Sequence, residues 1–133
     1  MTSKITYLGH LRTSSVHLQS GTEILSDAPV DNHGKGEAFS PTDLVANALG
    51  SCILTIMGIK AQDLNLDISG TTAEVTKTMQ AEPRRIAKIE INITFDKPQE
   101  EKTKKILEKA AMTCPVFNSL HPDLEKDIHF NWK

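Results

Sequence analysis

Aromatic residues are scarce in this sequence. Only six of its 133 residues are Phe, Tyr or Trp, whereas 38% are hydrophobic in total. The core must therefore be built mainly from Leu, Ile, Val, Ala and Met side chains. A chain of this length fits one domain, so we expect a single domain over residues 1–133. Because a small aliphatic core gains from sharing surface with a partner, we also expect an oligomer.

An excess of charge of one sign is lacking too. The 15 Lys and Arg residues nearly balance the 17 Asp and Glu residues, for a formal net charge of −2. Nucleic-acid-binding domains usually carry a basic stripe with interleaved aromatic residues, and none is present. The four lysines of segment 100–109 are accompanied by three glutamates, which is typical of a solvated helix face. We therefore expect no nucleic-acid partner.

Membrane and export signals are also missing. The longest uncharged stretch, Leu44–Ile59, has 16 residues, whereas about 20 apolar residues are needed to span a bilayer. No apolar run follows Lys4, so we expect no secretory signal. These features predict a cytoplasmic protein with no membrane partner, in a compartment that keeps thiols reduced.

Cysteine and histidine do not form a metal-binding pattern. The two cysteines lie far apart in the sequence, and the five histidines are scattered. Neither residue type shows the short spacings of a CxxC motif or a zinc site. We expect no metal site and no cofactor.

The order of expected elements is that of an α+β protein. The segment 86–95 alternates isoleucines with polar residues, as a half-buried strand does. Acidic residues precede lysines after Pro98, an order that matches the helix dipole. Extended structure that begins a hairpin is expected over 4–19, and further strands are expected over 22–26, 72–79, 86–95 and 128–132. Helices are expected to begin at residue 41 and after residue 98. This order is not a regular β-α-β alternation.

The strongest local signal is a helix start at Ser40. Ser40 has the side chain of an N-cap, a proline follows at the first helical position, and Asp43 lies near the free amides. The residues 44–59 are apolar on nearly every face, which indicates a buried central helix. Gly50 and Gly58 each cost about 1 kcal/mol of helix propensity relative to Ala, so we expect a packing reason for them.

Cys52 lies in the middle of this helix and admits two interpretations. A cysteine on a buried helix is usually a small core hydrophobe. A catalytic cysteine must instead be a thiolate at neutral pH, and a free thiol titrates near 8.5. The helix dipole does not reach a mid-helix position, so a cation must come from elsewhere. Arginine suits this role because it never loses its charge. Arg12 stands apart from Arg84 and Arg85, which share a turn.

Two segments resemble a known family. Residues 39–52 (FSPTDLVANALGSC) resemble the signature of the OsmC/Ohr superfamily, which includes osmotically inducible protein C and organic hydroperoxide resistance protein. Residues 114–120 (CPVFNSL) resemble its second motif, a Cys-Pro dipeptide and a short helix ending in Leu. Residues 27–29 and 34–36 resemble the connecting loop. Two motifs at a compatible spacing are far more specific than either cysteine alone.

This resemblance implies a fold and an activity. The fold would be one OsmC-like domain, an α+β structure with antiparallel sheets packed around a long buried central helix, assembled as an intertwined homodimer. The activity would be a thiol peroxidase acting on organic hydroperoxides, reduced by small dithiols or lipoylated proteins. In this resemblance, Cys52 matches the family's peroxidatic cysteine, and Cys114 matches the resolving cysteine that forms a disulfide with it. Arg12 matches the arginine that activates the peroxidatic cysteine.

The resemblance breaks at one position. In the Ohr branch a Glu after the proline holds the arginine, whereas this chain has Thr42 there and its acid one residue later, at Asp43. Asp43 either replaces that Glu or caps the helix. The difference favours a divergent OsmC-like branch. It also motivates a second hypothesis, a redox-sensing or small-ligand-binding protein with negligible turnover.

Overall fold

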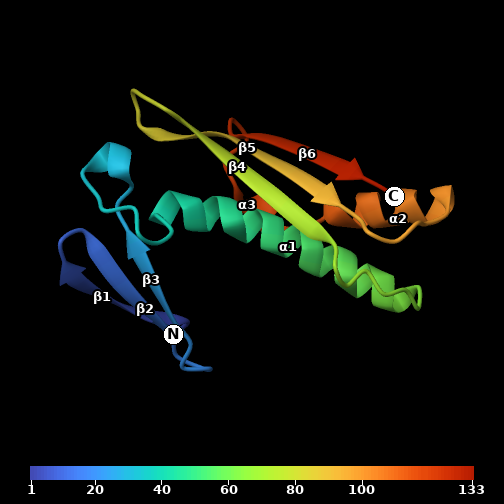
Figure 1. Ribbon diagram of the computed structural model, residues 1–133, viewed down its shortest axis with the longest axis horizontal. Coiled ribbons are helices and arrows are strands. Elements are labelled where there is room, and N and C mark those ends of the chain that lie inside the picture. The colour runs from blue at the N-terminus through green and yellow to red at the C-terminus, as the bar shows by residue number, and fades with distance from the viewer. The chain divides into compact units, whose positions relative to one another are not determined.

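The computed structural model describes residues 1–133, and its contacts divide the chain into two compact units. The first unit is Met1–Val45 and the second is Ala46–Lys133. The two units are coloured in chain order in Figure 1 and are described here one at a time. The expectation of one domain over residues 1–133 stays a prediction.

The first unit is a three-stranded antiparallel sheet in the order β1-β2-β3. Its strands are β1 (Ser3–Gly9), β2 (Arg12–His17) and β3 (Glu23–Asp27). They confirm the strands predicted within 4–19 and over 22–26, and a short 3-10 helix (Val30–Asn32) follows. Direct cross-strand neighbours include Arg12 on β2 and Asp27 on β3, a pairing on which the site described below depends.

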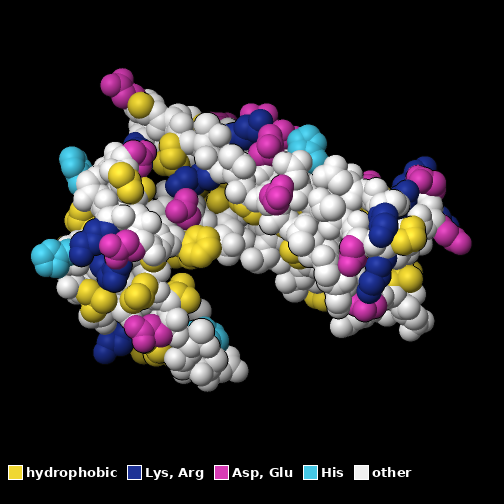
Figure 2. All heavy atoms as spheres, viewed as in Figure 1, with side chains coloured by type: hydrophobic (Ala, Val, Ile, Leu, Met, Phe, Trp, Pro, Cys, Tyr) yellow, Lys and Arg dark blue, Asp and Glu magenta, His cyan; other side chains and the backbone are white.

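Hydrophobic side chains of the first unit are largely exposed. Ile5, Tyr7 and Ile24 are 64%, 62% and 49% exposed, and the strand register places Ile5 and Ile24 on one face, on either side of Ser15. Figure 2 shows hydrophobic side chains at the surface of this unit. Its buried polar residues are Ser26, Asp27 and Ser40. Because a small sheet needs a covered apolar face, this unit gains stability from a covering surface.

The second unit confirms the α+β class. A sheet of β4 (Thr72–Gln80), β5 (Arg85–Thr94) and β6 (Glu125–Asn131) is accompanied by α1 (Pro41–Asp63), α2 (Glu101–Ala111) and α3 (Pro115–Ser119). The three helices lie on one side of the sheet (Figure 1).

One detail of the expected sheets is corrected. β4 and β5 are antiparallel, but β5 and β6 pair in parallel, whereas antiparallel sheets were expected throughout. The connection between β5 and β6 contains α2 and α3. A helical crossover of this kind carries the chain back to the end of the sheet at which β5 begins, so the two strands run in the same direction.

The core of the second unit is aliphatic, as the composition predicts. Ile89, Ile91 and Ile93 of β5 are fully buried, which confirms the predicted alternation on this strand. The helices contribute the other large hydrophobic side chains that are fully buried, namely Leu49, Ile53 and Met57 from α1 and Leu107 from α2. Burial of a side chain of this size contributes about 1.5–3 kcal/mol, so the α1–β5 contact is a main source of stability in this unit.

The start of α1 is the predicted one. The Ser40 hydroxyl accepts a hydrogen bond from the Asp43 backbone N–H at 3.0 Å, and the Asp43 carboxylate accepts one from the Ser40 backbone N–H at 3.0 Å. This reciprocal arrangement is a capping box, with Asp in place of the usual Glu. It satisfies two amide groups that the helix itself cannot.

The faces of α1 differ from the expectation of a helix buried all round. Six of its residues are buried: Ala46, Leu49, Gly50, Ile53, Met57 and Ala61. The opposite stripe is exposed and contains Val45, Ala48, Thr55 and Ile59. The reason is that the sheet of a single chain covers only one side of the helix.

α1 is also longer than its uncharged stretch. With 23 residues and a mean hydropathy of 1.6 in its most apolar window, it meets the length and composition of a membrane span. The core helix of a globular protein meets the same test, and the buried stripe of α1 packs in the core of the second unit. The expectation of no membrane partner stays a prediction.

The two glycines of α1 provide a matched pair of substitutions. A Cβ at Gly50 would lie 2.9 Å from Cγ2 of Val75, whereas a Cβ at Gly58 would meet nothing within 4 Å. Both changes to Ala gain about 1 kcal/mol of helix propensity, but only Gly50→Ala also crowds the core. In urea unfolding, Gly58→Ala should be stabilised relative to the unchanged protein and Gly50→Ala should not. Equal stabilisation of both variants would contradict this packing.

Candidate active site

The second unit brings the two cysteines together. Cys52 is half-buried on α1 and packs against the core cluster, of which the fully buried Cys114 is a member. Cys52 is near enough to raise the pKa of the Cys114 thiol. Both are free thiols in this structure. Two sulfur atoms far apart in the sequence thus meet inside one unit.

Cys114 is positioned by a helix cap. It is the N-cap residue of α3, with Pro115 as the first helical residue. Its Sγ accepts a hydrogen bond from the Phe117 backbone N–H at 3.4 Å. Because α2 has already ended at Ala111, the short α3 fixes the direction of this sulfur. The Cys-Pro dipeptide that the sequence presents is therefore the local reason for the position of Cys114.

The surroundings of Cys114 favour its protonated form. Burial raises the pKa of the Cys114 thiol, and the hydrogen bond with Cys52 raises that pKa further, against a smaller lowering by the Phe117 N–H. With its pKa raised, Cys114 keeps its proton at neutral pH. The half-exposed Cys52 is consequently the sulfur that solvent-borne molecules can reach.

Arg12 is held firmly inside the first unit. Its Nε and Nη2 atoms lie 2.7 Å and 2.8 Å from the two carboxylate oxygens of Asp27, and Nη2 lies 3.0 Å from Glu37. The Arg12 guanidinium holds the pKa of the Asp27 carboxyl below its usual range, and the two carboxylates raise the pKa of Arg12. A two-point pair of this kind fixes the plane of the guanidinium.

Sequence reasoning missed both of these carboxylates. The usable signal was the hairpin register, since Asp27 stands directly opposite Arg12. Thr42 and Asp43, the partners considered from sequence, lie at the start of α1, where Asp43 completes the capping box and the Thr42 hydroxyl lies 3.2 Å from that of Ser40. Capping by Asp43 is confirmed, and its role beside an arginine stays a prediction. So does the activation of Cys52 by Arg12, because the two residues belong to different units.

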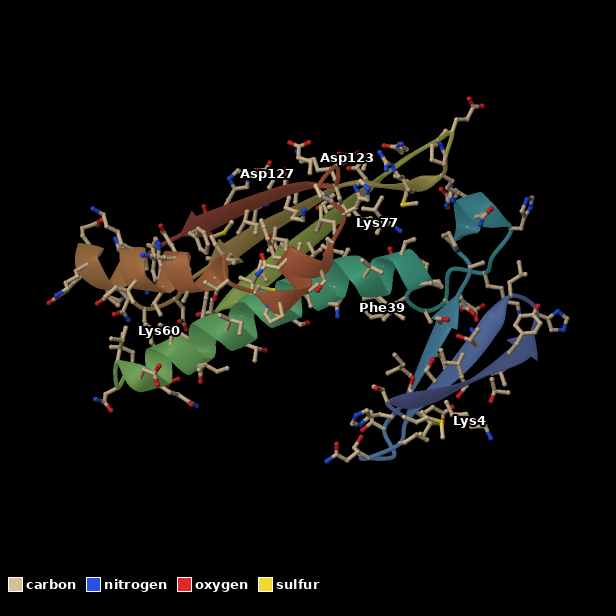
Figure 3. All side chains as sticks on the ribbon, turned by 180° about the vertical axis from the view of Figure 1, so that it is seen from behind. Lys4, Phe39, Lys60, Lys77, Asp123 and Asp127 are labelled. Atoms are coloured by element: carbon tan, nitrogen blue, oxygen red, sulfur yellow. The ribbon has the colours of Figure 1, made fainter.

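An apolar groove is lined by residues that lie near both cysteines in the sequence. It has a volume of about 450 Å³ and lies between α1 and α2. Ile56 lines it one helical turn after Cys52, and Ala110 lines it four residues before Cys114. The remaining lining residues are Ile59, Lys60, Asp63, Ile106, Lys109 and Thr113. Lys60 is seen on α1 in Figure 3. The groove offers an aliphatic surface with charged side chains at its rim.

One cluster elsewhere has the residue types of a metal site. Ligand atoms of Glu90, Asp127 and His129 lie within 4.8 Å of one another, and Asp127 is on the side of β6 away from the helices (Figure 3). The Lys88 ammonium lies 3.3 Å from Asp127 and 3.5 Å from Glu90. The cluster is thus an ion-pair network in which the lysine already supplies positive charge, and the expectation of no metal site stays a prediction.

A comparison with protein-family models agrees with these features, which are a mid-helix cysteine, a Cys-Pro helix cap and an α+β fold with two sheets. The model of the family described as OsmC-like protein matches residues 34–128. The chain belongs to the OsmC-like protein family. No curated protein matches it, so the remaining comparisons are with solved structures.

Several solved structures resemble this OsmC-like protein over nearly their whole length. A Psychrobacter arcticus protein, described as an osmotic stress induced and detoxification response protein, is 59% identical, with a TM-score of 0.95 over 98% of this chain and 95% of its own. A Legionella pneumophila organic hydroperoxide resistance protein OsmC is 13% identical, with a TM-score of 0.76 over 98% and 97%. A Vibrio cholerae organic hydroperoxide resistance protein with captopril bound in one of its active sites is 15% identical, with a TM-score of 0.72 over 98% and 92%. The last two share the fold.

The two thiols of this OsmC-like protein should differ in reactivity. Under native conditions we expect iodoacetamide to modify Cys52 and to leave Cys114 unmodified, because Cys114 is fully buried and its pKa is raised. Peptide mapping by mass spectrometry measures both sites, and the protein unfolded in urea, in which both should react, is the control. Faster native modification of Cys114 than of Cys52 would contradict the site geometry.

Proposed function

We propose that this protein is a thiol peroxidase that reduces organic hydroperoxides. The observation that carries the proposal is the contact between a half-exposed Cys52 and a buried, protonated Cys114. Membership of the OsmC-like family and the description of the 59% identical relative as a stress and detoxification protein support a redox role in stress responses.

The first step of the proposed reaction takes place at Cys52. The Cys52 thiolate attacks the distal oxygen of the hydroperoxide, and the O–O bond breaks. The sulfur gains one oxygen and becomes a sulfenic acid, while the alkoxide takes up a proton and leaves as an alcohol. The sulfur is oxidised by two electrons, and the peroxide is reduced by two.

The second step uses Cys114. Its thiol attacks the Cys52 sulfenic acid, the S–O bond breaks, and a Cys52–Cys114 disulfide and one water molecule form. The proton that Cys114 holds leaves with the hydroxide. A dithiol then restores both thiols by disulfide exchange. A small dithiol or a lipoylated protein in the cytoplasm would serve as this reductant.

The proposal assigns activation of Cys52 to Arg12. The Nε and Nη2 atoms of Arg12 are already occupied by Asp27 and Glu37, which leaves the Nη1 edge for a thiolate. A positive charge there lowers the thiol pKa and stabilises negative charge in the transition state. An arginine keeps its charge at any pH at which the reaction would run.

The apolar groove supports an organic substrate. Its walls are largely aliphatic, with Ile56, Ile106 and Ala110 among them. An alkyl or aryl group gains about 25 cal/mol for each Å² of apolar surface that it buries, whereas hydrogen peroxide gains nothing there. A preference for organic hydroperoxides over hydrogen peroxide follows from this difference.

The proposed assembly is a homodimer. The exposed stripe of α1 contains Val45, Ala48, Thr55 and Ile59, of which Val45 and Ile59 are 38% and 53% exposed. The sheet of the first unit is open as well, with Ile5 64% exposed. A second copy of the chain would cover both surfaces, and apolar surface of this kind is typical of obligate interfaces.

Thr42 favours a second candidate function. Where the Ohr branch has a Glu, this chain has a hydroxyl that contacts Ser40 at 3.2 Å. If that Glu is needed for fast turnover, the protein would act as a redox sensor that oxidises once and is slowly reset. Stoichiometric oxidation without sustained peroxide consumption would favour the sensor.

The peroxidase proposal predicts distinct losses in two cysteine variants. With cumene hydroperoxide and dihydrolipoamide, Cys52→Ser should abolish peroxide consumption, because the attacking sulfur is gone. With stoichiometric peroxide, Cys114→Ser should stop at a Cys52 sulfenic acid that dimedone traps. Peroxide assays and mass spectrometry measure the two results. Unchanged consumption in Cys52→Ser would refute the mechanism.

The dimer proposal predicts the effect of a charge on α1. Light scattering should give about twice the chain mass of 14.7 kDa for the unchanged protein. Ala48→Glu places a carboxylate in the exposed stripe and should shift the protein to monomers, because a buried unpaired charge is costly. Lys102→Glu, on the exposed side of α2, is the matched control and should stay dimeric. A monomeric unchanged protein would exclude the dimer.

A further inference from the structure

The Arg12 guanidinium has an anchor that differs from the one the family signature implies. Thr42 occupies the position of the signature's Glu, and a hydroxyl cannot form a two-point ion pair with a guanidinium. Asp27 does form one, at 2.7 Å and 2.8 Å. Asp27, on the neighbouring strand of the same sheet, is therefore a candidate for the residue that holds the arginine.

The geometry of this pair is fixed from three directions. Arg12 on β2 and Asp27 on β3 are direct cross-strand neighbours, so the sheet sets their separation. Asp27 is only 1% exposed, which limits its rotamers. Its Oδ2 atom also accepts the Glu37 backbone N–H at 3.2 Å, and its own backbone N–H donates to Phe39 at 3.1 Å. These restraints together fix the position and orientation of the Asp27 carboxylate.

Glu37 differs from Asp27 in each of these respects. Its side chain is 63% exposed, and it meets Arg12 by a single contact at 3.0 Å. Exposed single-point ion pairs contribute little. Of the two carboxylates beside the guanidinium, only Asp27 can determine how that group is oriented.

We propose that Asp27 is the positioning residue of the peroxidase site, fixing the plane of the Arg12 guanidinium with its Nη1 edge left open for the Cys52 thiolate, and that Glu37 is dispensable for this role. The inference rests on the proposed activation of Cys52 by Arg12. It adds a residue that the family signature does not assign and explains how the chain works with Thr42 in place of a Glu.

Orientation and net charge make opposite predictions for this site. One guanidinium beside two carboxylates carries a net charge of −1, so removing the charge of Asp27 makes the group less negative. If charge alone mattered, Asp27→Asn would lower the Cys52 pKa. If Asp27 acts by positioning, the loss of its second strong acceptor releases the guanidinium, and the Cys52 pKa rises toward the value near 8.5 of a free thiol.

The test is the pH profile of Cys52 alkylation by iodoacetamide in the full-length protein. The profiles of Arg12→Met and Asp27→Asn should move to higher pH together, and that of Glu37→Gln should not rise. If the unchanged Cys52 is ionised at pH 7, a shift to about 8.5 leaves roughly 3% thiolate, so the alkylation rate should fall by up to about 30-fold. Thermal unfolding of each variant verifies that the fold is retained.

Arg12→Lys keeps the test decisive if Asp27→Asn does not fold. Lysine retains the charge but lacks the planar fork that Asp27 holds. The inference expects Arg12→Lys to resemble Arg12→Met, and a profile like that of the unchanged protein would overturn it. A shift in Arg12→Met without one in Asp27→Asn would also overturn the inference while leaving the role of Arg12 in place. No shift in Arg12→Met would refute the role of Arg12 itself, and the inference with it.

Discussion

The contact between the Cys52 and Cys114 side chains is the interaction on which the proposed chemistry depends. Each sulfur is placed by a different part of the second unit, Cys52 by a half-buried position on α1 that packs against the core and Cys114 by the cap of α3. Burial and the partner sulfur both raise the pKa of the Cys114 thiol. The pair is therefore unequal: one thiol is kept protonated in the core, and the other is reachable from outside. The proposed mechanism needs this difference, because one sulfur attacks the peroxide and the other then forms the disulfide with it.

The charged part of the site has a separate origin. The Arg12–Asp27 pair belongs to a sheet whose apolar residues are exposed, and it is fixed by strand register and burial of the carboxylate. In the proposed mechanism the second unit supplies the two sulfur atoms, and the first unit supplies a guanidinium with a fixed orientation. The exposed stripe of α1 and the open sheet explain why such a small, aliphatic chain would assemble as a dimer.

The sequence predicted the elements well where local chemistry determines them. The Ser40 cap and the alternation on β5 were readable because both depend on residues close in sequence, and the family motifs identified the two cysteines. Features that depend on tertiary structure were not readable. The parallel pairing of β5 and β6 follows from the helical crossover, and the one-sided burial of α1 follows from how much surface the chain can supply. Asp27 and Glu37 were missed because a carboxylate's partner is set by strand register, while the sequence motif directed attention to Thr42 and Asp43.

The most direct test of the account is a disulfide map after one equivalent of cumene hydroperoxide. Non-reducing peptide mapping by mass spectrometry should recover one link per chain, between the peptides of Cys52 and Cys114, with cumyl alcohol formed in equal amount. Recovery of Cys52 as a sulfinic acid, or linked to the Cys52 of another chain, with Cys114 still reduced, would contradict the claim that these two sulfurs react with each other.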